Sequence, residues 1–288
     1  MFGVLTRITL VQKAKAMNRN KDNRYGIPYC QIVRFPDNTL ENLRVAYHQV
    51  RLPDFVREFL NGAPSVDRDF LNQCPSLFSR TADGAFFVRP NLPKYAPETL
   101  FQNFARSWRN TGRLELVAWH AHRAIEPFLR HDPQDGPITV DRLLQLRIRE
   151  IEEELCVRYL ATPLDLEASD VTSLERLREH VYDQLANVYG IDEPQGTEIY
   201  FHTFNMPEFA LLHLQIRHNK PLHHAEHSRT YYLDDVIARL KSGKHFMEGI
   251  TDEGRQTYFF GNDNPKLLDF LRTIEGHVLI NDAPNPYL

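Results

Sequence analysis

Cysteine is scarce in this sequence, and the three residues present lie too far apart to form a C-x-x-C metal or redox motif. They are Cys30, Cys74 and Cys156. Because an odd number of cysteines argues against a framework of disulfide bonds, we expect the protein to reside in a reducing compartment.

Long apolar runs are also missing. No stretch of about 18 apolar residues, the length that spans a bilayer, occurs in the chain. The apolar stretch at residues 4–11 is short, is interrupted by Arg7, and lacks the residue order of a signal peptide. We therefore predict a soluble protein without a membrane partner, located in the cytoplasm or, as an alternative, in the nucleus.

The chain carries no excess of positive charge. Its 288 residues include 34 Lys and Arg against 38 Asp and Glu, which gives a net charge of −4. This balance excludes a protein that coats nucleic acid by bulk charge. A few well-placed cations still suffice to bind one nucleotide, so we expect a small nucleotide or, at most, a short RNA as partner.

Common phosphate-binding and metal-binding motifs are absent as well. Neither G-x-G-x-x-G nor G-x-x-x-x-G-K-[ST] occurs, so a Rossmann fold and a P-loop are not indicated. Histidines crowd residues 217–229, but no cysteine or carboxylate accompanies them at ligand spacing. We expect no metal ion and no cofactor.

What the sequence does contain is the composition of a globular protein. Apolar residues make up 42% and charged residues 25%, and the length allows two domains. A change in pattern near residues 81–84 suggests a mixed N-terminal domain at 1–82 and a second domain at 83–288.

Apolar periodicity predicts both helices and strands. Strands are expected at residues 30–35, 43–50, 85–89, 197–204, 211–217 and 256–260. Helices are expected at residues 54–60, 97–108, 139–155, 173–189, 232–241 and 266–273. Residues 114–119 fit either a strand or the start of a helix, and the tail from Asn281 reads as irregular. Two successive strands joined by a short connection favour an antiparallel α+β fold.

The strand expected at residues 211–217 carries the most informative pattern. His213, Gln215 and Arg217 alternate with apolar residues and therefore share one face. An imidazole beside a carboxamide suits phosphate chemistry, because the histidine can attack phosphorus while the amide binds a phosphoryl oxygen. The same pattern also fits a strand whose histidine is only structural.

Several motifs, in order, resemble the scavenger mRNA decapping enzymes of the histidine-triad superfamily. The segments concerned are SLERLREH at 173–180, EIYFHTFNMPEFALLHLQI at 198–216 and SRTYYLDDVIARL at 228–240. Upstream, DGAFFVRPNLPKY at 83–95 is similar to the strand and loop that contact the cap, and 43–60 loosely resembles the end of the family's N-terminal domain. Residues 112–168, expected to be helical, have no counterpart.

The resemblance implies an α+β fold with a histidine-triad-like antiparallel sheet, flanking helices and a smaller mixed N-terminal domain. It also implies a homodimer with an exchanged N-terminal segment. Aligned through Pro207, it places Leu211, His213 and Gln215 at the three triad positions, with His213 as the nucleophile. Leu211 and Gln215 replace histidines of the family.

The glutamine at the third position is the pattern of a sister branch, the hexose-1-phosphate uridylyltransferases and dinucleoside tetraphosphate phosphorylases. In that branch the middle histidine still forms a nucleotidyl intermediate. A second alignment register stays open, in which His213 comes first, Gln215 is central and Arg217 third, and this register removes the nucleophile.

The same resemblance suggests residues that bind substrate. Arg229 matches an arginine at the start of the following helix and would pair with phosphate oxygens, while His202 matches a histidine near the family's site. Asn91 and Lys94 lie where the family contacts the cap guanine and phosphates. Asn91 replaces an aspartate that reads the base edge and Pro93 is an insertion, which leaves a rigid turn as the other interpretation. Trp108 and Trp119 are candidates for base stacking, and core packing is the other interpretation for Trp108, which lies on a helical apolar stripe.

These observations predict a hydrolase that cleaves the polyphosphate bridge of a capped dinucleotide or a short capped RNA fragment through a nucleotidyl-histidine intermediate. His213 and Gln215 are the expected catalytic residues. Two alternatives remain: a dinucleoside polyphosphate phosphorylase or nucleotidyltransferase, and a catalytically silent nucleotide-binding protein.

Overall fold

The computed structural model describes most of the chain. The residues described are 29–36, 40–53, 77–91, 112–122, 125, 140–192, 195–202, 207–219, 230–244, 255–260, 265–276 and 278–284. The chain divides into two compact units: unit 1 comprises Met1–Ala46, Leu222–Thr230 and Met247–Leu288, and unit 2 comprises Tyr47–Pro221 and Tyr231–Phe246. No helix among the described residues is long and apolar enough to cross a membrane.

Unit 1 contains a three-stranded antiparallel sheet in the order β8-β1-β9. Its strands are β1 (Tyr29–Pro36), β8 (Arg255–Phe260) and β9 (Val278–Pro284), and helix α11 (Pro265–Arg272) lies between the last two in sequence. The predicted strands at 30–35 and 256–260 and the helix at 266–273 are confirmed. The irregular tail predicted from Asn281 is wrong, because β9 continues to Pro284 by pairing with β1.

Helix α2 (Leu40–His48) corrects the strand predicted at residues 43–50. Leu40, Leu43 and Tyr47 are all buried, and their spacing of three and four residues places them on one side of a helix. Near its start, Asn42 Nδ2 donates a hydrogen bond to the Glu275 carbonyl at 3.2 Å, within unit 1.

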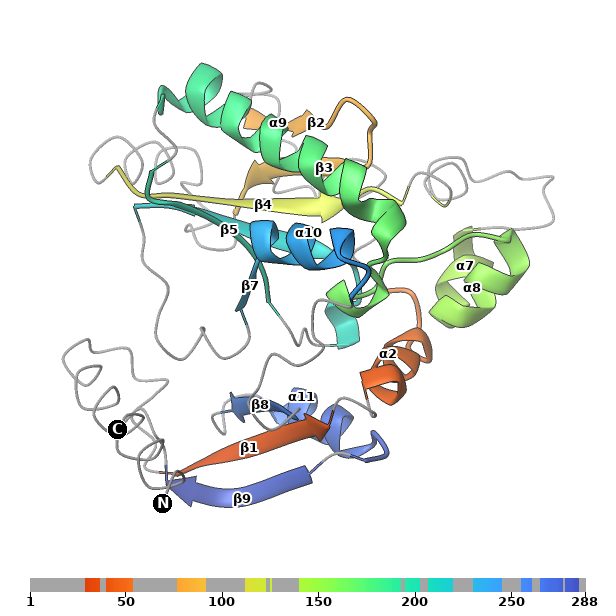
Figure 1. Cartoon of the computed structure of the whole chain (residues 1–288). Coiled ribbons are helices and arrows are strands. Elements are labelled where there is room, and N and C mark those ends of the chain that lie inside the picture. Colours follow the sequence, from red (N-terminus) through yellow and green to blue (C-terminus); the bar gives the residue numbers. More distant parts are fainter. Residues whose placement is uncertain are drawn as a thin grey trace, which may run out of the picture. The chain divides into compact units, whose positions relative to one another are not determined.

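Unit 2 is built on a six-stranded sheet in the order β2-β3-β4-β6-β5-β7 (Figure 1). The strands are β2 (Ser79–Arg80), β3 (Phe86–Pro90), β4 (Leu114–His120), β5 (Thr197–His202), β6 (His213–His218) and β7 (Thr230–Tyr232). The registers from β2 through β6 to β5 are antiparallel. The described residues therefore form an α+β structure, as predicted.

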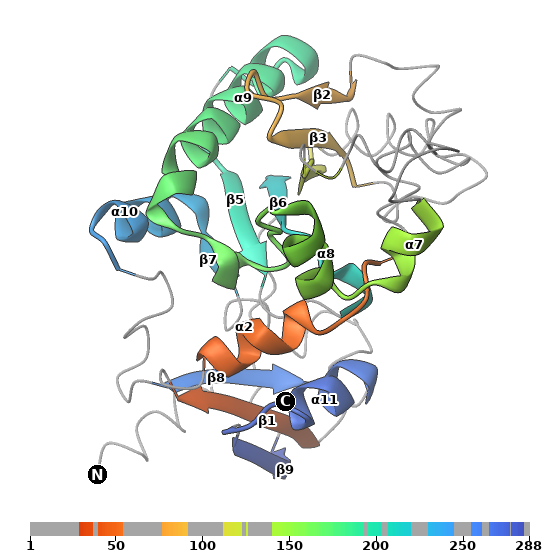
Figure 2. The same cartoon turned by 90° about the vertical axis from the view of Figure 1, so that its right-hand side faces the viewer.

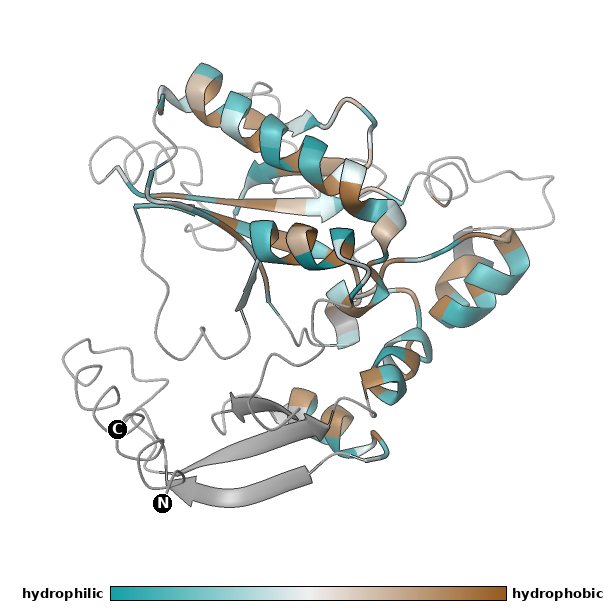
Figure 3. Ribbon diagram, in the orientation of Figure 1, coloured by the Kyte–Doolittle hydropathy of each residue, from teal (hydrophilic) through white to brown (hydrophobic). Residues whose placement is uncertain are grey.

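One face of this sheet is covered by helices α9 (Val171–Tyr189) and α10 (Leu233–Lys241), as Figures 1 and 2 show. Figure 3 shows the apolar and polar sides of both helices. Leu174, Leu177, Val181 and Leu185 of α9 are fully buried and repeat at helical spacing. Gly190 ends α9 with a φ of 67°, a left-handed conformation that favours glycine. The predicted helices at 173–189 and 232–241 are confirmed.

The domain boundary expected near residue 82 falls within a β-hairpin. Arg80 of β2 pairs with Phe87 of β3, and the Gly84 amide donates to the Thr81 carbonyl at 2.7 Å in the turn between them. Both strands belong to unit 2, so the two compact units divide the chain elsewhere.

The segment at 112–168 is not wholly helical. It begins with β4, which pairs with β3 and β6 inside the sheet. The single helix predicted at 139–155 is two helices, α7 (Val140–Gln145) and α8 (Ile148–Leu155). The interruption has a tertiary cause: Leu52 N–H donates to the Leu146 carbonyl, Ile148 N–H donates to the Val50 carbonyl, and Arg147 takes extended backbone angles.

The helices predicted at 54–60 and 97–108 lie outside the described residues, and so do residues 203–204, the last two of the strand predicted at 197–204. The strands predicted at 85–89, 197–204 and 211–217 correspond to β3, β5 and β6, and residues 114–119 form a strand.

Candidate functional site

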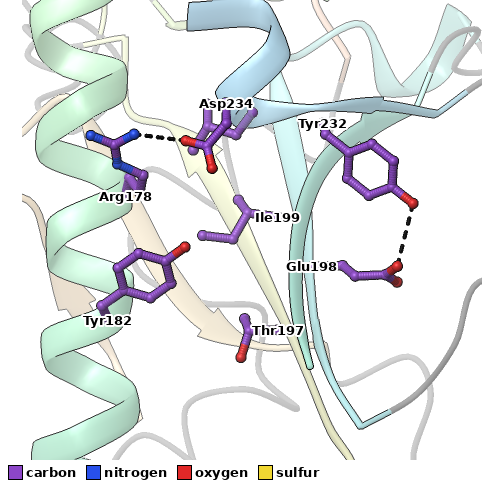
Figure 4. A pocket seen from close by; sticks show the side chains of 8 residues that line it. Arg178, Tyr182, Thr197, Glu198, Ile199, Tyr232 and Asp234 are labelled. Atoms are coloured by element: carbon purple, nitrogen blue, oxygen red, sulfur yellow. Dashed lines mark hydrogen bonds and ion pairs between the residues drawn. The ribbon is translucent and has the colours of Figure 1, made fainter. Parts of the chain in front are cut away.

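The two faces of the sheet in unit 2 differ in chemistry. Thr197 and Ile199 of β5 lie toward Arg178 and Tyr182 of α9, with which they line a small cleft (Figure 4). Side chains alternate along a strand, so Glu198, between them, points to the opposite face, away from the helices. We call this opposite face of the sheet the polar face; its residues are those of the cross-strand rows described next.

Cross-strand pairing arranges the polar face in three rows. The first row holds Phe87, Trp119 and His213; the second holds Arg89, Val117, Gln215 and Tyr200; the third holds Glu115, Arg217 and Glu198. His202 follows Tyr200 by two residues on β5 and so belongs to the same face. Charged side chains are buried here: Arg89, Glu115 and Arg217 are each less than one-tenth exposed.

His213 is half-buried at the start of β6. Its Nδ1 lies 2.8 Å from the Leu211 carbonyl oxygen, which only accepts hydrogen bonds, so Nδ1 carries the proton. Burial lowers the pKa of His213 to about 4, and the bond to Leu211 opposes this effect only in part. The imidazole is therefore neutral at pH 7, and its lone pair is on Nε2.

The indole of Trp119 packs against the His213 ring from the neighbouring strand β4. The ring centroids are 4.3 Å apart and the ring planes are inclined by 31°. The sequence left β4 open between strand and helix, so the placement of Trp119 beside His213 was not foreseen. The alternation Glu115, Val117, Trp119 was the available signal.

Asn91 and Gln215 are joined by a hydrogen bond in which Asn91 Nδ2 donates to Gln215 Oε1 at 3.0 Å. Asn91 is buried, with 8% exposure. Because the bond occupies Gln215 Oε1, the Nε2 end of the same amide has the geometry to donate to a second acceptor, such as a phosphoryl oxygen. Asn91 therefore orients Gln215, and its expected contact with a base stays a prediction.

His202 belongs to an aromatic group on β5. Its ring centroid lies 4.8 Å from that of Tyr200, and the Arg217 guanidinium lies 5.6 Å from the centroid of the same Tyr200 ring. The polar face thus brings together His213, Gln215, Asn91 and His202. Lys94 and Arg229, the other predicted binding residues, lie outside the described residues.

Two buried arginines on the polar face were not assigned a role by sequence reasoning. Arg89 lies in the same row as Gln215, and Arg217 follows Gln215 by two residues on β6. Burial lowers the pKa of Arg89 to about 10, which leaves it cationic at pH 7. The signal that could have found Arg89 is the alternation Phe87, Arg89, Asn91.

The cleft in Figure 4 lies where α9 and the start of α10 meet β5, and Glu198 of the polar face also contributes to its lining. It measures about 130 Å³ and contains none of the predicted site residues. Arg178 Nη1 and Asp234 Oδ1 form an ion pair of 2.7 Å across it, which ties α9 to α10. This pair gives the cleft a structural role, so we place the candidate site on the polar face.

Metal-ligating side chains do not converge in the part of the chain that the structure describes: no group of three or more His, Cys, Asp or Glu is placed to hold an ion. No protein-family model matches this chain, and no curated protein matches it significantly. The assignment of a reaction therefore depends on the residues of the polar face.

Proposed function

We propose that this chain cleaves the polyphosphate bridge of a nucleoside polyphosphate through a covalent nucleotidyl intermediate on His213 Nε2. The observation that supports the proposal most is the neutral His213 ring, whose proton is held on Nδ1 by the Leu211 carbonyl. This leaves the lone pair of Nε2 as a nucleophile on the face that also carries Gln215. Unit 2 would then be a histidine-triad-like domain.

In the first step, the Nε2 lone pair forms a bond to phosphorus, and the P–O bond of the bridge breaks with its electron pair leaving on the phosphate. Nδ1 keeps its proton, so the His213 ring becomes cationic. In the second step, water attacks phosphorus, the N–P electron pair returns to Nε2, and the water proton passes to solvent.

The neighbouring side chains would bind the phosphates. Gln215 Nε2 would donate to a phosphoryl oxygen, because Asn91 holds the other end of the same amide. His202 would bind the bridge from β5, and Lys94 and Arg229 would add positive charge. The resemblance to scavenger decapping enzymes suggests a capped dinucleotide or a short capped RNA as substrate.

Gln215 also supports a second candidate function. A carboxamide at the third triad position is the pattern of the uridylyltransferase and phosphorylase branch, in which an acceptor phosphate replaces water in the second step. The two reactions share the first step, and their products distinguish them.

The test is to incubate the protein with labelled capped dinucleotides and dinucleoside polyphosphates, with and without inorganic phosphate, and to denature it in alkali to preserve a phosphoramidate. We expect label on the wild-type protein and none on His213→Ala, with turnover falling by about 10³-fold or more. His218→Gln, on the same strand but with its side chain on the other face, is the matched control and should retain label.

Turnover that is unchanged in His213→Ala would overturn the proposal. A nucleoside diphosphate formed only in the presence of phosphate would assign the phosphorylase reaction. Nucleotide binding without cleavage of any bridge would show a silent nucleotide-binding protein.

A further inference from the structure

Trp119 and His213 are direct partners in the β4–β6 register. Their ring centroids are 4.3 Å apart, so the π-face of the indole covers one side of the imidazole. On its other side in the sheet, Trp119 pairs with Phe87, which in turn packs at 6.0 Å against Phe78. Trp119 thus belongs to an aromatic row that fixes its position.

The His213 ring changes charge during the proposed reaction. It is neutral in the resting protein and becomes cationic when Nε2 bonds to phosphorus while Nδ1 keeps its proton. Its hydrogen-bond partner on Nδ1 is a carbonyl. Within the described residues, no carboxylate is hydrogen-bonded to this ring, and the group that packs on its face is the Trp119 indole.

We infer that Trp119 stabilises the positive charge that develops on the His213 ring, through a cation–π interaction. The inference depends on the proposed function. An indole has the most favourable aromatic face for a cation, and the attraction is stronger when water is excluded. The same face interacts more weakly with a neutral imidazole, so Trp119 favours the intermediate over the resting state and accelerates the chemical step.

The test compares Trp119→Phe and Trp119→Leu with the wild-type protein in single-turnover experiments with a labelled capped dinucleotide. The rate of label transfer to His213 should fall by about 3-fold in Trp119→Phe and by about 10-fold in Trp119→Leu. The dissociation constant of the substrate should stay within about 2-fold of the wild-type value. The His213 ring is neutral both before and after substrate binds, so its interaction with residue 119 does not change on binding. Phe86→Leu is the matched control, since Phe86 also lies on β3 but packs against His120 on the other face of the sheet.

Fluorescence gives a second readout. The chain has two tryptophans, so a Trp108→Phe variant leaves Trp119 as the only indole emitter. Formation of the intermediate should quench its emission, because a cationic imidazole then lies against the indole. The quenching should be absent in the same background with His213→Ala.

The outcomes distinguish a failure of the inference about Trp119 from a failure of the proposed function. Equal rates of label transfer in all Trp119 variants would overturn the inference and leave the proposed function intact. A raised dissociation constant with an unchanged rate would show that Trp119 contacts substrate, and would also overturn it. Absence of label on the wild-type protein would overturn both.

Discussion

His48 and His213 mark two regions of unit 2 in which the same side chain takes opposite charge states. His48 Nδ1 donates to Glu152 Oε2 at 2.8 Å, and His48 Nε2 donates to Asp165 Oδ1 at 2.7 Å. Burial disfavours its charged form, but the bonds to Asp165 and Glu152 outweigh burial and raise the pKa of His48 to about 9. At His213 burial lowers the pKa to about 4, and the bond to the Leu211 carbonyl opposes this effect only in part.

The difference shows that the partners decide the charge of a buried histidine. Both carboxylates near His48 are held by backbone amides: Asp165 Oδ2 accepts from Ala161 and Thr162, and Glu152 Oε1 accepts from Tyr159. His48, which is cationic at pH 7, therefore joins the end of α2 to α8 and to the turn Pro163–Asp165. A neutral histidine such as His213 keeps a lone pair for chemistry.

The largest loss of stability is expected when the positive charge of His48 is removed. His48→Gln leaves the carboxylates of Glu152 and Asp165 without their positive partner, and we expect the free energy of unfolding to fall by about 3 kcal/mol. Urea denaturation followed by circular dichroism measures the change. A double-mutant cycle with Glu152→Gln should show coupling, and additive effects of the two substitutions would contradict the ion-pair interpretation.

His48 and His213 should contribute to the free energy of unfolding in different pH ranges. The folded protein holds the His48 proton more tightly than the unfolded chain, so His48 stabilises the fold fully below pH 6.5. This contribution, about 2 kcal/mol with allowance for screening at partly exposed Glu152, disappears as the pH rises through about 9. The difference in unfolding free energy between wild type and His48→Gln should therefore narrow between pH 6.5 and 9.5.

His213 should behave in the opposite way. Its folded pKa lies below the ordinary value of 6.5, so the unfolded chain takes up the proton first and stability is lost as the pH falls from 6.5 to about 4. Burial lowers the pKa of His120 to about 4 as well, so both histidines contribute to the loss of stability in acid. His213→Gln should remove part of the acid loss and none of the alkaline loss; the reverse pattern in a pH series of urea curves would contradict this assignment.

A smaller effect is expected from the amide that orients Gln215. Asn91→Ala frees Gln215 Oε1, and we expect turnover to fall by about 10-fold while stability falls by about 1 kcal/mol. Asn91→Asp removes the donor but keeps the shape, so the Gln215 amide should turn its hydrogens toward the new carboxylate. Steady-state kinetics should rank Asn91→Asp at or below Asn91→Ala. Full activity in both variants would exclude a role for this bond.

The smallest effect is expected at Glu153, the neighbour of Glu152 on α8. Glu153 forms an ion pair of 2.8 Å with Arg149, and both side chains are 63% exposed. Solvent screens such a pair, so Glu153→Gln should leave the urea midpoint unchanged within error. This variant is the matched reference for Glu152→Gln. If it lowered the free energy of unfolding as much as Glu152→Gln does, burial would not explain why the ion pairs of His48 stabilise the fold.

The sequence predicted the elements whose signals are local. The apolar spacing of α9 and its Gly190 stop, the stripe of α10, and the alternation of β3 and β6 all lie within short windows of sequence. Helix α2 was mistaken for a strand even though the spacing of Leu40, Leu43 and Tyr47 is helical. The other two errors arose from contacts between distant residues: the break between α7 and α8 depends on residues 50–52, and β9 exists because it pairs with β1.

The candidate site divides in the same way. Alternation along one strand placed His213 and Gln215 on one face, and the structure agrees. The bond from Asn91 to Gln215 joins residues 124 positions apart, and no local pattern predicts it. The roles of Lys94 and Arg229 stay predictions.

Alternation along each strand was enough to show which side chains share a face, and the near-neutral charge and the lack of phosphate loops excluded several functions. The position of β4 between β3 and β6, which sets Trp119 against His213 and brings Asn91 to Gln215, follows from the folded sheet alone. Strand register depends on the packing of whole faces against one another, and residues far apart in sequence contribute to that free energy together.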